Sequence, residues 1–548
     1  MAKKPPVDPL TGPKLAITGQ VVTMDDAFTR IRRGTVYIEL GGIVAVQNAG
    51  QAAPAGFEAT PVVDVRGTIF PGLIELHNHL AYNALRLWQV PRLFKNRDQW
   101  GGTGEYQKLV TGPMKVMGWS ENVMPSLVRY VECKCLVGGV TTSQGIELFS
   151  NAGARRYYRG IVRNVEQTDE PELPEAVTRI ADVDARSPER FLARLKKQTC
   201  FLLHLSEGID QTARKHFRAL QLPDGEWAIT PALAGIHCAG LLNEDFKIFG
   251  RRHASMVWSP MSNLLLYGAT SRVKSARDNG VRIGLGSDWA VSGSKNLLGE
   301  LKVARLASDE MDTGFSDRDL VAMATRDAAA ILGWQQRLGS LRPGARADLI
   351  VLDGTPDDPY KALVKAAETS LSLVMINGVA RFGTSSLMTR LGADGERVTI
   401  GGRQRMIFMD QASADEVVSG ISLGQARSTL VDALHRLPQI ARDLEQNRTG
   451  PVRAFSARMT RSGPPVWFLA LDELEPTGVE LRPRLPGASG SPTGPTLRTT
   501  ARAIPLSELV TPMTLDPLTV ADDAEFLDRV EAQTVLPDFV RTKLKAMY

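Results

Sequence analysis

The sequence predicts an α/β protein built around a (β/α)8 barrel, with smaller β units on either side. Three observations lead to this prediction. Between residues 71 and 335, short apolar runs typical of strands alternate with helical stretches. Such alternation favours parallel strands joined by helices, and about 260 residues is an ordinary length for a barrel of this kind. On both flanks of this region the pattern changes to β character with turns.

The N-terminal flank, residues 14–70, is expected to form short strands joined by turns. Polar and apolar residues alternate from Thr35 to Leu40, and Gly41-Gly42 follows as a turn. In the central region the strand-like runs are 139–147, 158–167, 200–208, 232–240, 255–263 and 281–289. A helix is predicted at 188–198, because Ser187 can cap it and Pro188 suits its first position.

The C-terminal flank returns to β character at 338–354 and 370–383. Residues 336–388 are therefore predicted to complete the small sheet begun at 14–70. Residues 389–548 form a further α+β segment, here called the C-terminal segment. Its pattern predicts a helix at 423–446, a strand at 465–471 and an exposed Pro/Gly/Ser-rich loop at 482–495. Three roles are open for this segment: a lid, an oligomerisation element or a partner-binding domain.

The composition excludes several classes of protein. Hydrophobic residues make up 43% of the chain and charged residues 23%, and the net charge is only +5, which is the balance of a soluble globular protein. No basic cluster indicates a nucleic-acid surface, and no apolar run is long enough to span a membrane. The start MAKKPPVDPL lacks an apolar h-region, so no secretory signal is expected. Four cysteines in so long a chain predict reduced thiols and a cytoplasmic location.

Polar side chains stand where the predicted strands end. His77 and His79 follow the run GLIEL, His204 follows FLL, His237 follows LAGI and Asp288 follows RIGLGS. Residues i and i+2 of a strand face the same side, so the first two imidazoles can hold one metal ion. The carboxyl ends of barrel strands form one active-site face, which is expected to bring all five side chains together. Because zinc favours imidazole and carboxylate ligands, the sequence predicts a catalytic metal centre.

These motifs carry a specific resemblance. The segments PGLIELHNH, HLSE, GIHC, SPMSN and GLGSDWAVSGSKN resemble the amidohydrolase superfamily, and within it the branch of cytosine and guanine deaminases and triazine chlorohydrolases. The flanking segments resemble the composite β-sandwich of that superfamily. The resemblance covers residues 14–385 and implies a sandwich from 14–70 and 336–388 beside a metal-dependent barrel at 71–335.

The resemblance also implies a role for each site residue. The metal ligands would be His77, His79, His204 and Asp288. His237 would hydrogen-bond the metal-bound hydroxide or the substrate, and Glu207 takes the acid position of the His-x-x-Glu motif. Two-metal members bridge their ions with a carboxylated lysine at the end of a middle strand. We find no lysine at such a position, so one ion is expected, with Zn²⁺ the first candidate and Fe²⁺ or Mn²⁺ as alternatives.

The side-chain chemistry agrees with these roles. Water bound to a catalytic zinc ion falls in pKa toward ~7 and becomes a nucleophilic hydroxide. Asp288 can take the proton of the attacking water, and Glu207 can protonate a ring nitrogen or a leaving group. Polar and aromatic residues near the motifs are candidates for substrate binding, namely Tyr82, Asn83, Trp88, Asn263 and Trp289.

The leading hypothesis is a metal-dependent hydrolase that deaminates an amino-substituted heterocycle, a small-molecule substrate. The same parts would serve an amide, lactam or carbamate-type hydrolase or a hydrolytic dehalogenase, and the sequence leaves these alternatives open. A catalytically silent interaction protein is a third class, which the retention of every predicted ligand disfavours. A homo-oligomer is compatible with the sequence, whereas nucleic acid and membrane partners are not expected.

Overall fold

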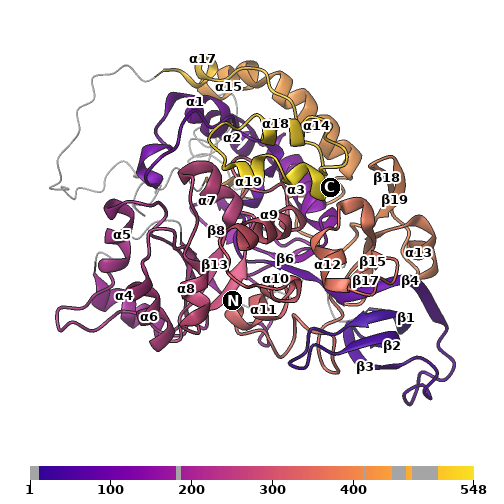
Figure 1. Ribbon diagram of the computed structural model, residues 1–548. Helices are drawn as coiled ribbons and strands as arrows, with labels where there is room; N and C mark the ends of the chain where they lie inside the picture. Colours follow the sequence, from indigo (N-terminus) through magenta and orange to yellow (C-terminus); the bar gives the residue numbers. More distant parts are fainter. Residues whose placement is uncertain (1–11, 180–186, 412–413, 447–464, 472–503) are drawn as a thin grey trace.

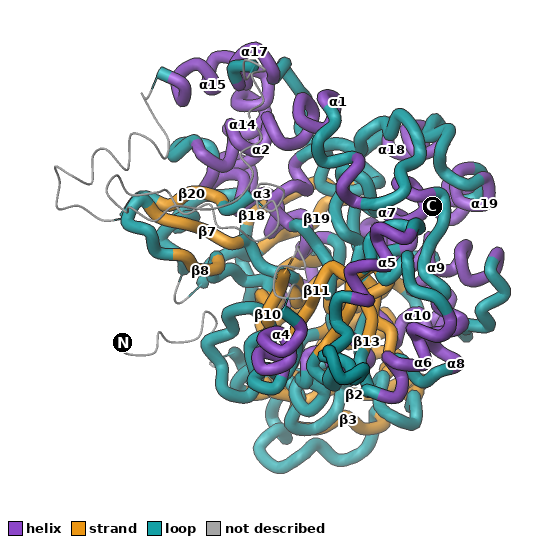
Figure 2. The backbone as a smooth tube through the Cα atoms, turned by 90° about the vertical axis from the view of Figure 1, so that its left-hand side faces the viewer, coloured by secondary structure: helices purple, strands orange, loops and turns teal. Residues whose placement is uncertain are grey.

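Parallel strands form the centre of the molecule (Figures 1 and 2). The computed structural model describes residues 12–179, 187–411, 414–446, 465–471 and 504–548. Within these residues, one parallel sheet contains β5 (Leu73–Glu75), β6 (Val140–Ser143) and β9 (Arg163–Asn164). A second contains β10 (Val177–Arg179), β11 (Phe201–Leu205), β12 (Leu233–His237), β13 (Ser255–Trp258) and β14 (Arg282–Leu285). The predicted alternation of strands and helices in a mixed α/β region is confirmed.

Backbone hydrogen bonds link these two parallel sheets on both sides. Between β9 and β10, the amide of Ala176 donates to the carbonyl of Val165 over 2.8 Å. Beyond β5 and β14, the amide of Asp288 donates to the carbonyl of His77 over 2.8 Å, and the amide of His79 donates to the carbonyl of Asp288 over 2.7 Å. The carboxyl ends of β5 and β14 therefore lie side by side, although they are far apart in the sequence.

A nine-stranded sheet joins the two flanks of the parallel region. In spatial order its strands are β18 (Glu396–Ile400), β19 (Arg403–Ile407), β17 (Val379–Gly383), β16 (Leu371–Ile376), β15 (Leu349–Asp353), β4 (Val62–Pro71), β1 (Leu15–Val22), β2 (Arg30–Glu39) and β3 (Gly42–Asn48). β4 runs parallel to β1 and antiparallel to β15, with Phe70 opposite Ile350. The two flanks thus share one sheet, as predicted, and β18 and β19 of the C-terminal segment extend it.

A small antiparallel sheet ties the C-terminal segment to the parallel region (Figure 2). Its strands are β8 (Arg155–Tyr157), β7 (Glu147–Ser150) and β20 (Trp467–Leu469). β20 pairs with β7, with Phe468 opposite Phe149 and Leu469 opposite Leu148. The strand predicted at 465–471 is confirmed, and the structure adds its partner.

Helices cover the parallel strands and continue into the C-terminal segment, whose last helices lie over the same side of the molecule as α9 (Figure 1). Up to residue 332 the α-helices are α1 (Gly104–Tyr106), α2 (Gly112–Trp119), α3 (Met124–Val137), α4 (Pro188–Leu195), α5 (Gln211–Arg218), α6 (Asn243–Arg251), α7 (Pro260–Tyr267), α8 (Val273–Asp278), α9 (Leu297–Glu310), α10 (Asp317–Met323) and α11 (Arg326–Leu332). Later ones are α12 (Pro359–Val364), α13 (Ser385–Arg390), α14 (Leu423–His435), α15 (Leu437–Glu445), α17 (Leu506–Leu509), α18 (Phe526–Glu531) and α19 (Asp538–Arg541). Short 3₁₀ or π turns are η1 (Leu80–Ala84), η2 (Arg97–Gln99), η3 (Gln107–Thr111), η5 (Glu368–Ser370) and η8 (Leu544–Met547).

Two predicted helices have different bounds in the structure. The helix expected at 188–198 ends at Leu195, because the next residues close a tighter turn in which the amide of Lys197 bonds to the carbonyl of Arg194. The helix expected at 423–446 is broken at Arg436 into α14 and α15. Pro438 explains the break, since it lacks the amide proton that a continuous helix would need there. The loop predicted at 482–495 lies outside the described residues.

All four cysteines are buried, and none is in a disulfide bond. Burial raises the pKa of the Cys200 thiol to about 12, which keeps it protonated and unreactive. The expectation of reduced cysteines thus agrees with their positions. No helix among the described residues is long and apolar enough to cross a bilayer.

The folded protein is expected to resist thiol reagents. Because all four cysteines are buried, Ellman's reagent should react negligibly with the native protein and release four equivalents of thiolate after unfolding in guanidinium. Absorbance at the thionitrobenzoate band measures both states. Rapid reaction of one or more thiols in the native protein would contradict the buried placement.

Candidate metal centre and active site

The residues predicted at the metal centre lie together at the carboxyl ends of four parallel strands. His77 and His79 come just after β5, and Asp288 comes after β14. His204 lies near the end of β11, and His237 is the last residue of β12. All five side chains are buried, with at most 8% of any residue exposed. The structure therefore brings the whole predicted set to one end of the parallel strands.

The ligand atoms of these residues converge. His77 Nε2 lies 3.1 Å from His204 Nε2 and 3.3 Å from Asp288 Oδ1. Asp288 Oδ1 also lies 3.4 Å from His79 Nε2. Two ligands at about 2.0–2.1 Å from a tetrahedral zinc ion are about 3.3 Å apart, so these spacings suit ligands of one ion. Two candidate ligand groups, one with His237 and one with Asp288, share His77, which indicates a single centre.

The backbone is strained at two of these strand ends. His237 and Asp288 have φ angles of 64° and 66°, in the left-handed region that residues with a side chain avoid. Such a conformation costs on the order of 1–3 kcal/mol and is typically found where it serves a site. Gly286 lets the two strand ends approach, because a Cβ there would lie 2.3 Å from the Cβ of His77. The strain aims both side chains at the centre.

The start of α7 fixes two of the predicted ligands. Ser259, the residue before the helix, places its hydroxyl oxygen 2.8 Å from His77 Nδ1. Ser262 in the first turn donates a hydrogen bond of 2.6 Å to Asp288 Oδ2. Partners of this kind orient metal ligands and are often as important to a site as the ligands themselves.

Asn263, on the same helix, contacts His237. The amide oxygen of Asn263 accepts a hydrogen bond of 2.8 Å from His237 Nδ1, so the other ring nitrogen is free to face the site. His237 Nε2 lies 3.7 Å from Glu207 Oε2. Asn263 is fully buried, and this contact gives it a positioning role in the described structure.

Glu207 is held at both carboxylate oxygens. Arg97 Nη1 donates to Oε2 over 3.1 Å, and the Tyr267 hydroxyl donates to Oε1 over 2.8 Å. Burial alone raises the pKa of Glu207, but the positive charges of His237 and Arg97 and the Tyr267 hydrogen bond outweigh it, so the pKa is lowered. Glu207 is therefore ionised at neutral pH before any substrate binds.

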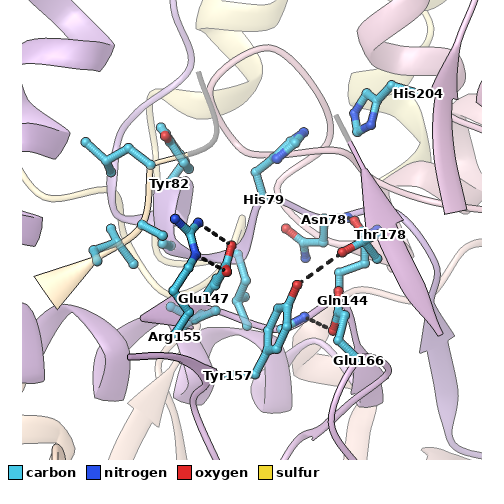
Figure 3. Close-up of a pocket in the computed structure, with 17 residues that line it drawn as sticks. Asn78, His79, Tyr82, Gln144, Glu147, Arg155, Tyr157, Glu166, Thr178 and His204 are labelled. Atoms are coloured by element: carbon cyan, nitrogen blue, oxygen red, sulfur yellow. Dashed lines mark hydrogen bonds and ion pairs between the residues drawn. The ribbon is translucent and has the colours of Figure 1, made fainter. Parts of the chain in front are cut away.

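Two adjoining cavities share His79 and His204. The smaller, here called the catalytic pocket, has a volume of about 290 Å³. Its lining residues are His79, Arg97, Trp100, His204, Glu207, His237, Asp288 and Trp289. The larger, here called the outer pocket, has a volume of about 730 Å³ with its open mouth included. Figure 3 shows His79 and His204 on one side of it and the Glu147, Arg155, Tyr157 and Glu166 group on the other.

The residues predicted to bind substrate fall in different places. Tyr82 lines the outer pocket and Trp289 the catalytic pocket. Asn83 accepts a hydrogen bond of 2.7 Å from the amide of Ala290 instead, which ties the loop after β5 to the loop after β14. Trp88 packs against aromatic neighbours, with its ring centroid 5.6 Å from that of Tyr106. Substrate contact stays a prediction for all five candidates.

Arg97 and Tyr267 were not predicted from the sequence. Arg97 lies in η2, within a stretch that carries no motif, and reaches Glu207 only through the tertiary fold. Tyr267 ends α7, on the face that also presents Asn263 four residues earlier. Predicting a helix from SPMSN onwards would have placed Tyr267 on the same face as Asn263, and so towards the site. No local sequence pattern indicates a role for Arg97.

Residues 211–381 match the amidohydrolase family. The resemblance predicted from the sequence motifs is confirmed. His237 and Asp288 lie within the matched residues, and the other predicted ligands precede them.

Curated relatives of this chain include deaminases. The 5-methylthioadenosine/S-adenosylhomocysteine deaminase of Syntrophobacter fumaroxidans is 27% identical over 402 residues, which cover 65% of this chain and 89% of that protein. The 5'-deoxyadenosine deaminase of Methanosarcina mazei is 23% identical over 443 residues, which cover 73% of this chain and 98% of that protein. Nearly all of each relative is matched, while part of this chain has no counterpart in them.

Solved structures share the fold. A mutant of atrazine chlorohydrolase from Arthrobacter aurescens, complexed with zinc and atraton, aligns with a TM-score of 0.54 and 22% identity over 67% of this chain and 94% of its own. Guanine deaminase from Bradyrhizobium japonicum aligns with a TM-score of 0.53 and 17% identity over 67% of this chain and 99% of its own. At these identities the likeness establishes the fold alone.

Metal content should depend on the buried histidines. The purified protein is expected to carry about one equivalent of divalent metal, and His204→Ala should reduce this below about a tenth of an equivalent because an inner ligand is lost. His253→Ala is the matched control, since His253 is exposed and outside the cluster. Inductively coupled plasma mass spectrometry measures both. Unchanged metal content in His204→Ala would refute the assigned site.

Proposed function

We propose that this protein is a metal-dependent hydrolase that removes an exocyclic amino group from a nitrogen heterocycle. The observation that carries the proposal is the position of Glu207, which lines the catalytic pocket together with His237 and Asp288. A carboxyl group at that place can protonate a ring nitrogen as the amino group leaves. The deaminase relatives support the same reaction class.

One divalent ion would complete the site. The ligands proposed for it are His77, His79, His204 and Asp288. Zinc is proposed first because the donor set and spacing suit it, and Fe²⁺ or Mn²⁺ are alternatives that accept the same ligand types. When bound, such an ion lowers the pKa of a coordinated water and so supplies a nucleophile at neutral pH.

The chain's own residues would handle the protons. Asp288, held at Oδ2 by Ser262, would accept the proton that the attacking water loses. Glu207 is ionised before substrate binds, so it would take up a proton from water and deliver it to the ring nitrogen. The proton held by Asp288 would pass to the departing amino group, which leaves as ammonia. Arg97 and Tyr267 fix the direction of its two carboxylate oxygens. His237 would present Nε2 to the substrate or the water.

The aromatic walls of the catalytic pocket suit a flat ring. Trp100 and Trp289 both line it, with ring centroids 6.1 Å apart and planes at 62°. Trp100 is anchored, because its indole nitrogen donates to the Tyr267 hydroxyl over 2.9 Å. Indole faces offer large apolar contact to a heterocycle while leaving its edge to polar groups.

Hydrolytic dehalogenation is the second candidate function, since an atrazine chlorohydrolase shares the fold. Amide, lactam or carbamate-type hydrolysis by the same groups is a further alternative. A catalytically silent interaction protein is disfavoured, because a buried polar cluster of this kind is costly to keep without a use.

We also propose that the three-stranded and five-stranded parallel sheets form one closed (β/α)8 barrel. The hydrogen bonds between the β9 and β10 regions and between the ends of β5 and β14 support closure. In this proposal, residues 71–335 are the barrel domain, residues 14–70 and 336–388 form a composite β-sandwich, and residues 389–548 are a C-terminal extension. Pairing of β4 with both β1 and β15 supports the composite flank.

We propose a cytoplasmic enzyme acting on a small molecule. Four buried cysteines outside any disulfide bond support the proposed location. Homo-oligomerisation is compatible with the chain, and nucleic acid is not proposed as a partner.

Glu207→Gln should abolish most turnover while keeping the metal. The amide cannot donate a carboxyl proton, so kcat for ammonia release should fall by about 10²–10⁴-fold. Ammonia release from adenine, guanine, methylthioadenosine and amino-triazines, followed with glutamate dehydrogenase, measures the reaction, and metal analysis checks the site. Wild-type protein that opens rings or releases chloride, but never ammonia, would favour the alternatives.

Tyr267→Phe should weaken catalysis and shift its pH profile. A hydrogen bond to a charged group contributes about 1.5–3 kcal/mol, so kcat should fall at least about tenfold. The Tyr267 hydroxyl lowers the pKa of Glu207, so its removal raises that pKa, and the acid limb of kcat/KM should move to higher pH.

Tyr158→Phe is the matched control for this variant. Its hydroxyl donates to another buried carboxylate, that of Glu132, over 2.7 Å, and it does not line the catalytic pocket. Tyr158→Phe should lower the stability of the protein but leave the acid limb of kcat/KM at the same pH as in the wild-type protein. Equal shifts of the limb in both variants would contradict the role given to Tyr267.

A further inference from the structure

The outer pocket is walled on one side by the C-terminal segment. Leu469, Ala470 and Leu471 line it, together with His79 and His204 of the metal centre. Residues far apart in the sequence therefore meet around a cavity that opens directly onto the candidate ligands. The outer pocket therefore lies where a substituent on a ring bound beside these two imidazoles would extend.

The wall formed by residues 469–471 is fixed in place. Leu469 pairs with Leu148 of β7, and the amide of Ala470 donates to the carbonyl of Glu147 over 2.9 Å. Leu469 also packs closely on α2, because a Cβ at Gly118 would lie 2.8 Å from the Cβ of Leu469. Leu469 and Leu471 are 1% and 3% exposed. The wall is a packed part of the structure.

The charged groups that line the outer pocket beside this wall are neutralised. Arg155 makes two contacts with Glu147, from Nε to Oε1 over 2.7 Å and from Nη2 to Oε2 over 3.0 Å. The buried Glu166 accepts a hydrogen bond of 2.8 Å from the amide of Gly145. Burial raises the pKa of Glu166 to about 8, so its carboxyl group is mostly uncharged at neutral pH.

The lining of the outer pocket therefore combines the apolar side chains of Leu469 and Leu471 with polar groups that carry no excess charge. A charged group on a ligand would meet no unpaired partner among these residues, and burying it would be costly. A neutral group with an apolar surface would find contacts with both kinds of side chain. The lining thus discriminates by charge and by shape.

We propose that residues 469–471 of the C-terminal segment are specificity-determining residues, and that the pocket they wall takes a neutral, partly apolar substituent on the heterocycle. The proposal rests on the proposed function, in that the reacting ring occupies the catalytic pocket beside it. His79 and His204 line both pockets, so the bond between the heterocycle and its substituent would lie beside these two imidazoles.

The first test compares a bare ring with substituted rings. Adenine probes the catalytic pocket alone, and methylthioadenosine adds a neutral substituent. S-adenosylhomocysteine adds a zwitterionic one, whose ammonium and carboxylate groups would both have to leave water. In the wild-type protein, kcat/KM for methylthioadenosine should exceed that for S-adenosylhomocysteine by at least tenfold. Equal or better use of the charged substrate would overturn the proposed neutral pocket.

The second test changes the wall. Leu471→Ala removes apolar contact and Leu471→Phe fills the pocket, so each should raise KM for methylthioadenosine about tenfold, while KM for adenine and kcat change less than twofold. Leu536→Ala is the matched control, because Leu536 is a buried leucine of the same segment that does not line the outer pocket. The proposal fails if Leu536→Ala changes the ratio of KM for methylthioadenosine to KM for adenine as much as the Leu471 variants do. It also fails if neither Leu471 variant changes this ratio.

A binding measurement separates this proposal from the proposed function. Calorimetry on the metal-loaded Glu207→Gln protein reports methylthioadenosine affinity without fast turnover. If Leu471→Phe weakens methylthioadenosine binding tenfold but the wild-type protein releases no ammonia, the proposed deaminase function is refuted and the role of residues 469–471 is supported. If the wild-type protein releases ammonia but substitution of Leu471 leaves the affinity for methylthioadenosine unchanged, the role of residues 469–471 is refuted and the deaminase function is supported. Neither binding nor ammonia release with any probe would overturn both.

Discussion

The candidate site depends on the pairing between the ends of β5 and β14. Glu75 and Ser287, 212 residues apart in the sequence, are joined by two hydrogen bonds of 2.8 Å from the Ser287 amide and hydroxyl to the buried carboxyl group. Just beyond them, Asn78 forms a parallel bridge with Asp288. This register sets His77 and Asp288 at ligand spacing. A slip of one residue would turn one of the two side chains away from the centre, because alternate residues of a strand face opposite sides.

A single helix supplies most of the support around that pairing. Ser259, Ser262 and Asn263 stand at positions i, i+3 and i+4 around the start of α7, so they share one face of the helix and reach His77, Asp288 and His237 in turn. One turn further on, Tyr267 reaches Glu207 from the same face. Two of the proposed metal ligands, together with His237 and the proposed acid, are thus positioned by one rigid element, which couples their geometry.

Features that local sequence pattern determines could be predicted. The pair His77 and His79 and the polar residues after β11, β12 and β14 were found because strand periodicity and the barrel rule fix where such side chains gather. β9 was hidden inside a longer predicted run, since only Arg163–Asn164 pair as a strand. The break at Pro438 was missed because the apolar periodicity continues across it.

Features that depend on tertiary contacts could not be predicted. Arg97 meets Glu207 across a long stretch of chain, and nothing in the residues around it shows a catalytic pattern. Leu471 lines the outer pocket only because β20 adds to β7, a pairing between segments that share no motif. The strand itself was predictable at 465–471, but its partner was not.

The C-terminal segment is bound to the site by buried charges as well as by β20. Asp516 forms ion pairs with Lys134 and Lys295, and Lys295 also lies 2.7 Å from Asp523. Lys134 in turn donates to the carbonyl of Asn83, in the turn that follows His79, over 2.8 Å. Burial lowers the pKa of Lys134 to about 8, although Asp516 opposes the change.

Removing the segment would take away the carboxylates that pair with both ammonium groups. The loop after β5 would lose its anchor at the same time. These contacts disfavour one of the three open roles, a lid that moves independently, because they fix the segment beside the candidate site.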